Sequence, residues 1–138
     1  SVGSGATHGY NLVENFVEET ENAGGSALAK YLTRNVRLKN ASDEIRMFLD
    51  VNRPSGTYVD VYYRVHTDDE LIDSVNWILH APTEGIPFSD EENAYHEAEY
   101  NIVPTGDFSV FAIKIVLKSS NSSRMPVCRD LRAIATKA

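Results

Sequence analysis

The chain has 138 residues, a length typical of a single domain built around one hydrophobic core. Hydrophobic residues make up 42% and charged residues 24% of the sequence, which is ordinary for a globular protein and excludes disordered or fibrous classes. The net charge is -7, and nucleic-acid binding normally needs a clustered basic surface. We therefore expect no nucleic-acid partner.

Two further absences narrow the class of protein. Cys128 is the only cysteine, so the chain can form neither an internal disulfide nor a cysteine-based zinc site. A single free thiol is compatible with folding in a reducing cytoplasm. No apolar run approaches the roughly 18 residues of a membrane-spanning helix, and the first residues lack the pattern of a signal peptide. We expect no membrane partner.

Residues 1–25 are predicted to be an extended N-terminal arm or linker, and residues 26–138 a separate domain. The arm is rich in Gly, Ser, Asn and Glu and ends at the chain breaker Gly24-Gly25. It carries one apolar cluster, which consists of Leu12, Val13, Phe16 and Val17. These side chains need cover, and we favour contact with a neighbouring subunit or a longer parent chain. The alternative is that the arm folds back onto its own domain.

From residue 31 onward the apolar pattern has a period of two, which is typical of strands with one buried face. Residues 89–102 are ambiguous, because Ser89 and Glu92 match a helix capping box while Ala98, Tyr100 and Ile102 alternate; we favour a strand from Tyr95. The predicted strands cover residues 31–38, 45–51, 58–65, 75–80, 95–102, 111–117 and 127–135. Short connections and the near absence of helical periodicity indicate an all-β fold, a jelly-roll-like antiparallel β-sandwich of about seven to eight strands.

The strongest alternation also predicts the core. One face of each of the second, third and sixth predicted strands is apolar throughout. Trp77 is expected to be at least partly buried. The residues predicted to be fully buried are Ile45, Met47, Leu49, Val59, Val61, Tyr63, Phe111, Ile113, Ile115 and Leu117.

The search for catalytic or metal-binding motifs yields little. His96-Glu97 lacks the second histidine of a zinc protease motif, and the acidic clusters at 68–70 and 90–92 lack the ligand spacing of an EF-hand. No G-x-S-x-G elbow is present. A carboxylate pair that hydrolyses glycosidic bonds is recognised by the distance between its two carboxyl groups, which the sequence does not give. A small hydrolase therefore remains an alternative function and ranks third. We expect no enzyme activity, no cofactor and no bound metal.

The outward faces of two predicted strands carry aromatic and charged residues. If Val59 faces the core, Tyr58, Tyr62 and Arg64 project outward, and Phe48 does so on the preceding strand. Exposed aromatic rings favour contact with another protein, or with a sugar that stacks on them. The equally weighted alternative is that the second sheet or the arm covers these rings.

Several segments, in this order, resemble domains of virion structural proteins from tailed bacteriophages, especially contractile-tailed phages of marine cyanobacteria. The likeness runs from about Ala29 to Thr136. The segments that carry it are Lys30–Leu38, Leu49–Thr57, Val59–Arg64, Trp77–Leu79, Phe111–Pro126 and Asp130–Ala135.

The resemblance implies a tail or baseplate component, with this segment as a β-rich domain at the C-terminal end of a longer polypeptide. It implies no catalytic residues. The expected partners are other virion tail proteins, with homo-oligomers in the assembly, since symmetric virion tails join many copies through large interfaces. The expected function is thus non-catalytic protein packing in the virion. The alternative is a carbohydrate-binding module that recognises host surface glycans through Tyr58, Tyr62 or Phe48.

Overall fold

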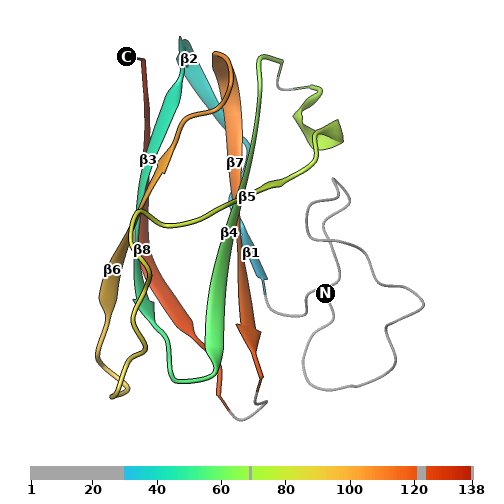
Figure 1. The fold of residues 1–138 in the computed structure, drawn as a ribbon. Coiled ribbons are helices and arrows are strands. Elements are labelled where there is room, and N and C mark those ends of the chain that lie inside the picture. The colour runs from blue at the N-terminus through green and yellow to red at the C-terminus, as the bar shows by residue number, and fades with distance from the viewer. Residues whose placement is uncertain (1–29, 69, 121–123, 138) are drawn as a thin grey trace, which may run out of the picture.

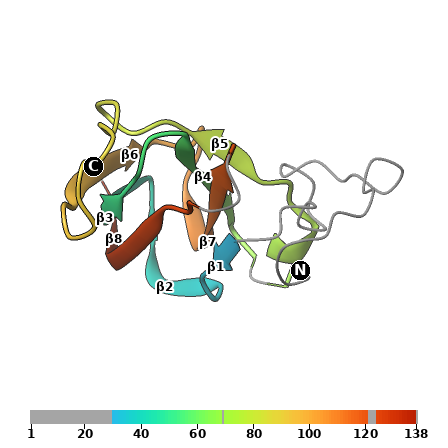
Figure 2. The same cartoon turned by 90° about the horizontal axis from the view of Figure 1, so that it is seen from below.

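The computed structural model describes residues 30–68, 70–120 and 124–137. They form an antiparallel β-sandwich, as the sequence predicts, with two sheets packed face to face (Figures 1 and 2). The described part contains one short 3-10 helix, η2 (Ile72–Ser74). The strands are β1 (Lys30–Leu32), β2 (Val36–Ser42), β3 (Glu44–Asn52), β4 (Thr57–His66), β5 (Ile78–His80), β6 (His96–Ile102), β7 (Phe108–Ser119) and β8 (Val127–Thr136).

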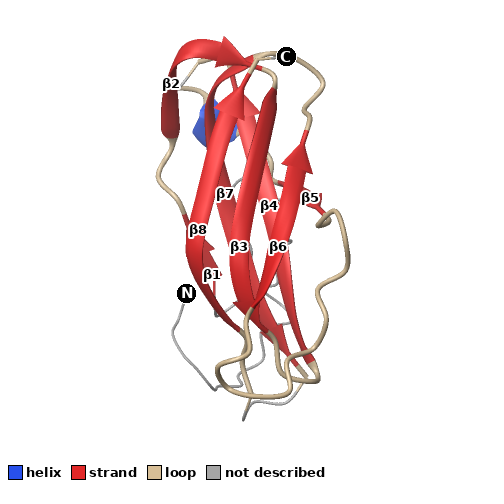
Figure 3. Ribbon diagram, turned by 90° about the vertical axis from the view of Figure 1, so that its left-hand side faces the viewer, coloured by secondary structure: helices blue, strands red, loops and turns tan. Residues whose placement is uncertain are grey.

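The larger sheet, sheet A, has the order β1-β7-β4-β5, and β2 pairs with β7 on the same side as β1. The smaller one, sheet B, has the order β6-β3-β8 and lies in front of sheet A in Figure 3. Most connections pass from one sheet to the other, since β3, β6 and β8 alternate along the chain with strands of sheet A. This alternation is the winding of a jelly roll.

The core lies between the sheets and is formed by their inward-facing side chains. Eight of the ten residues predicted to be buried are so, and Val59 and Leu117 are half-buried and pack against the same cluster. The other buried members are Val51 of β3, Ala98, Tyr100 and Ile102 of β6, and Phe108 at the start of β7. The two-residue period of β3 and β4 therefore identified the correct inner faces.

Sheet A also buries part of its outer face. Trp77 packs there against Tyr62 of β4 and against Ala112 and Val116 of β7, in a second apolar cluster. As a result the run from Val110 to Val116 is buried at every position, including Lys114. Strands that are covered on both faces are apolar on both faces, and β7 follows this pattern over most of its length, with Lys114 as the exception.

Two strand predictions are wrong in their extent. The predicted strand over residues 31–38 is divided into β1 and β2, and the apolar side chains of Leu32 and Val36 are exposed. The interruption is stabilised by Thr33, whose backbone N–H donates to Ile113 O and whose hydroxyl accepts from Ile113 N. The predicted strand over 75–80 shortens to β5, because Trp77 and its neighbours turn back over sheet A.

The turn between β3 and β4 shows why its sequence forms a hairpin. Thr57 N donates to Pro54 O, and Gly56 has φ +84°, as the third position of a type II turn requires. Glycine tolerates this conformation without a steric penalty. The turn lies at the lower end of the sandwich in Figure 1, beside the long loop between β5 and β6.

Candidate interaction surfaces

Tyr62 and Arg64, predicted as outward contact residues, do lie on the outer face of β4, but both are buried, at 6% and 7% exposure. Their cover is the segment around Trp77, and not the second sheet. The guanidinium of Arg64 stacks 4.2 Å from the Trp77 ring centroid. Of the two alternatives that the sequence left open, exposure and cover, these two side chains are covered, because the chain after β4 folds back over them.

Arg64 holds this covering segment in place. Its guanidinium donates to Asp73 Oδ1 at 3.1 Å and to Val75 O at 3.3 Å, and Asn35 Nδ2 donates to the same Asp73 oxygen at 3.2 Å. Burial lowers the pKa of Arg64, and the nearby Asp73 carboxylate opposes that shift. A buried cation that bonds to two points of one loop fixes the path of that loop.

A second buried cation lies beside the same rings. Lys114 Nζ lies 4.8 Å from the Tyr62 ring centroid and 5.2 Å from that of Trp77. Cation–π contacts strengthen when the cation is removed from water, as it is here. The outer face of β4 and β7 is thus a packed cation–aromatic layer.

Tyr58 is the predicted contact residue that remains exposed on β4. It belongs to a surface cluster of three side chains, in which the Arg53 guanidinium lies 5.1 Å from the Tyr58 ring centroid and 4.2 Å from that of Phe88. The two rings meet edge to face, 6.5 Å apart, and both are more than two-fifths exposed. We call Arg53, Tyr58 and Phe88 the aromatic end cluster.

Backbone contacts hold the aromatic end cluster rigidly. Arg53 donates to Thr57 O and Ile86 O, so its guanidinium is fixed between the two rings. Arg53 N donates to Ser89 Oγ, and Ser89 N donates to Arg53 O. The buried Asn52 side chain donates to Glu91 O and Ala94 O, both at 2.8 Å. The loop after β5 is therefore anchored to the β3–β4 turn, which sequence patterns did not indicate.

Phe48 lies on the outer face of sheet B, half-buried among charged side chains. Arg132 of β8 lies 5.5 Å from its ring centroid and donates to Glu97 of β6 at 2.9 Å. Arg46 donates to Glu99 at 2.8 Å on the same face. This outer face is a ladder of ion pairs with Phe48 among them, and it continues through Asp50 to Arg129, whose guanidinium lies 3.6 Å from the Tyr95 ring centroid.

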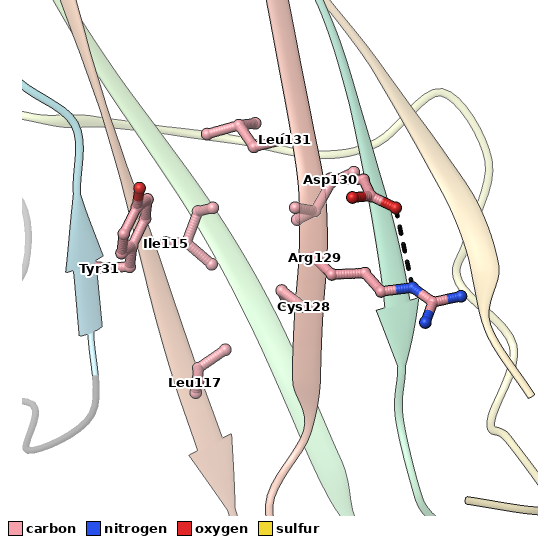
Figure 4. A pocket seen from close by; sticks show the side chains of 8 residues that line it. Tyr31, Ile115, Leu117, Cys128, Arg129, Asp130 and Leu131 are labelled. Atoms are coloured by element: carbon pink, nitrogen blue, oxygen red, sulfur yellow. Dashed lines mark ion pairs between the residues drawn. The ribbon is translucent and has the colours of Figure 1, made fainter. Parts of the chain in front are cut away.

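A pocket opens at the side of the sandwich between β1 of sheet A and β8 of sheet B (Figure 4). Its volume is about 370 Å³, and most of its lining is apolar. The lining residues are Tyr31, Leu49, Ile115, Leu117, Cys128, Arg129, Asp130 and Leu131. Because Leu49 and Ile115 belong to the core, the pocket reaches the core from outside.

A β-bulge in β8 shapes this pocket. Phe48 pairs with Arg132 but Asp50 pairs with Arg129, so β8 has one residue more than β3 over this step. Asp130 has φ +56°, a left-handed conformation that Asp tolerates better than most residues. The bulge lets Cys128 and Leu131 both pack against the core, although they are three positions apart, a spacing that places residues of a regular strand on opposite faces.

Two ionisable groups near the pocket are poorly solvated. Burial raises the pKa of the Cys128 thiol to about 11. Burial also raises the pKa of Tyr100, and its hydroxyl is buried without a hydrogen-bond partner. Both groups are neutral near pH 7, which fits an apolar surround.

Three further predictions concern the arm residues, metal binding and membrane insertion. Leu12, Val13, Phe16 and Val17 of the arm lie outside the described residues. Within the described ranges, no cluster of three His, Cys, Asp or Glu side chains is placed to hold a metal ion. No helix in that part of the chain is long and apolar enough to cross a membrane.

Comparisons with known proteins give a likeness of strand arrangement only. No family model and no curated protein sequence matches the chain. The VP2 subviral particle of infectious bursal disease virus superposes with a TM-score of 0.46 at 11% identity, over 82% of this chain and 34% of VP2. The D431N mutant VP2, from T=1 particles, gives 0.45 at 9% identity, over 81% and 33%. The chain spans about a third of these VP2 chains, and superposition this loose supports no statement about function.

Proposed function

We propose that the chain is a non-catalytic structural domain of a bacteriophage tail or baseplate protein, which acts by packing against other virion proteins. The sequence resemblance between Ala29 and Thr136 supports this assignment, and it spans all of the described strands. The site of action is the virion tail, after synthesis in the host cytoplasm. Partners are other tail proteins and further copies of this chain.

The observation that carries the proposal is the long edge of sheet B. The ten-residue strand β8 pairs with β3 and, among the described strands, with no other, so one row of its backbone groups faces outward. Ile134 and Val127 on this strand are 63% and 48% exposed. A sheet edge with apolar side chains is suited to pairing with another chain.

Localisation in the particle tests the proposal. Antibodies raised against the purified chain should label the tail or baseplate in electron micrographs of virions that encode it. Labelling of the head, or detection of the chain only in infected-cell lysate and not in virions, would contradict the assignment.

A variant tests the edge itself. Ile134→Lys should weaken incorporation of the domain into tail assemblies while leaving its fold intact, because the side chain is exposed. Lys39→Glu, an exposed change on β2, serves as the control. Equal incorporation of the two variants would show that β8 is not an interface.

A second candidate function, recognition of host surface glycans, is favoured by the aromatic end cluster. Tyr58 and Phe88 present two ring surfaces held rigid by Arg53, and sugars stack on such rings. A glycan array probed with the isolated domain should then show binding that Tyr58→Ala abolishes and Tyr31→Ala, at another exposed tyrosine, preserves. Binding unchanged by Tyr58→Ala, or no binding at all, would reject this candidate.

A further inference from the structure

The pocket between β1 and β8 lies where the N-terminal arm joins the sandwich. Residue 29 is followed directly by β1, and Tyr31 of β1 lines the pocket. We propose that the apolar cluster of the chain's own arm, led by Leu12 and Phe16, occupies this pocket. The inference concerns docking within one subunit and does not depend on the proposed place in a phage tail.

The length of the arm permits this docking. Thirteen residues, 17–29, separate Phe16 from Lys30. Fully extended, they span up to about 45 Å, more than the roughly 33 Å length of a ten-residue strand. Gly24-Gly25 allows the connecting segment to reverse direction. Phe16 can therefore reach any part of the pocket from Lys30.

The chemistry of the arm matches the pocket. Leu12 and Phe16 are four residues apart, so they share one face whether the segment is a strand or a helix. A pocket of about 370 Å³ falls within the roughly 300–1,000 Å³ range of sites that enclose small ligands, so it has room for both side chains. Docking would cover Tyr31, which is 57% exposed, whereas the core residues Leu49 and Ile115 are already buried.

The arm is acidic, and two basic residues lie near the pocket. Residues 1–29 contain four glutamates and no lysine or arginine. Lys30 lies at the start of β1, and Arg129, whose side chain is 55% exposed, lines the pocket. Arg129 also lies 4.0 Å from Asp50 and 3.8 Å from Asp130, a carboxylate on the same lining, so the arm's glutamates would share this cation. Glu14, between the two anchors, and Glu18, just beyond them, are placed in sequence to approach these cations.

The tether favours docking of the arm within its own subunit over exchange between subunits, because it raises the local concentration of the arm at its own pocket. A short flexible tether gives the arm an effective concentration in the millimolar range at its own pocket. An arm from another copy competes only when the protein itself reaches that concentration. This reasoning selects the fold-back alternative over the exchange that sequence composition favours.

Cys128 provides the test, because it lines the pocket and is the only cysteine in the chain. Its rate of reaction with a small aromatic disulfide at fixed pH reports whether the pocket is filled. If the arm binds with a Kd about ten times below its effective concentration, the full chain should react about tenfold more slowly than the Leu12→Ser/Phe16→Ser double variant. Val2→Ser, an apolar-to-polar change elsewhere in the arm, should react like the full chain.

Two further measurements distinguish the alternatives. Deleting residues 1–25 should raise the rate as the double variant does, and adding a peptide of residues 8–21 should lower it again. Circular dichroism checks that the truncated chain is folded; if it is not, the double variant decides alone. An unchanged rate in the double variant overturns the proposal, and so does protection that is lost on dilution, since that indicates an arm from another copy.

Discussion

The two sheets treat their outer faces differently. In sheet B, β3 alternates between buried Met47 or Leu49 and the outward Arg46, Phe48 and Asp50, so its outer face stays in contact with solvent. In sheet A, β7 is buried on both faces from Val110 to Val116. The difference arises because the segment that ends at Trp77 folds over sheet A and nothing comparable among the described residues covers sheet B.

This contrast indicates where partners can bind. The chain itself covers the middle of the outer face of sheet A with the segment around Trp77, which Arg64 anchors through Asp73. That part of the surface is therefore not available to partners. The surfaces left for other molecules are the ion-pair ladder of sheet B, the edge strand β8 and the aromatic end cluster. Two of the four predicted contact residues, Phe48 and Tyr58, lie on these open surfaces.

Removing the cover should produce the largest effect. Trp77 is 2% exposed, and Trp77→Ala deletes the side chain that separates Tyr62 and Arg64 from water. Truncation of a buried tryptophan typically lowers the free energy of unfolding by about 3–5 kcal/mol. Urea denaturation followed by circular dichroism measures this change.

The matched control for Trp77→Ala is Leu71→Ala in the same segment, where the side chain is half exposed. This substitution should change the free energy of unfolding by no more than about 0.5 kcal/mol. If both variants have the same stability, the segment is not a structural cover and the contrast between the sheets fails.

The core between the sheets should be nearly as sensitive. Ile113 is 1% exposed on the inner face of β7, so Ile113→Ala should cost about 2–5 kcal/mol in the free energy of unfolding. Ile134→Ala, at an exposed isoleucine of β8, is the matched control and should cost under about 0.5 kcal/mol. Similar melting curves for the two variants would show that Ile113 does not belong to a packed core between the sheets.

The parts of the fold that sequence predicted are those where one local pattern decides the outcome. β3 has a regular two-residue period, and its inner face follows from that period alone. β4 has apolar or aromatic residues on both faces, which left open whether Tyr62 is exposed or covered. The outcome depended on Trp77, fifteen residues later, whose place over sheet A has no local signal.

The surfaces were harder to predict because they are assembled from distant segments. Tyr58 was identified, but its neighbour Phe88 was not, since the loop that carries it is fixed by hydrogen bonds from Asn52 and Arg53. The pocket depends on an extra residue in β8 and on the early end of β1. Asp130 alone did not identify the bulge, because Asp is common in turns of several kinds.

A pH titration probes the pocket side of sheet B. Because the pKa of Cys128 rises from 9.0 to about 11 on folding, the folded chain holds this proton more tightly than the unfolded chain. The contribution to stability is complete below pH 9 and falls as the pH rises toward 11. The total loss should not exceed about 2–3 kcal/mol, because the shift is about two pKa units and the thiol is only partly buried.

The control for this titration is Cys128→Ser, whose hydroxyl does not ionise in this range. Tyr100 also has a raised pKa and contributes in the same direction at higher pH, and it is present in both proteins. The difference between the two stability curves therefore reports the Cys128 thiol together with its electrostatic effect on the Tyr100 pKa. Parallel curves between pH 8 and 11 would show that the thiol is solvated and that the pocket is wetter than its lining indicates.

The smallest effect is expected on the open face of sheet B. Arg132 and Glu97 form an ion pair at 2.9 Å, but their side chains are 53% and 54% exposed. Water and salt screen such pairs, so a double-mutant cycle with Arg132→Met and Glu97→Gln should give a coupling free energy under about 1 kcal/mol that decreases as salt is added. A coupling above about 2 kcal/mol, unchanged by salt, would mean that this face is shielded from water, and the outer surfaces of the two sheets would then be alike.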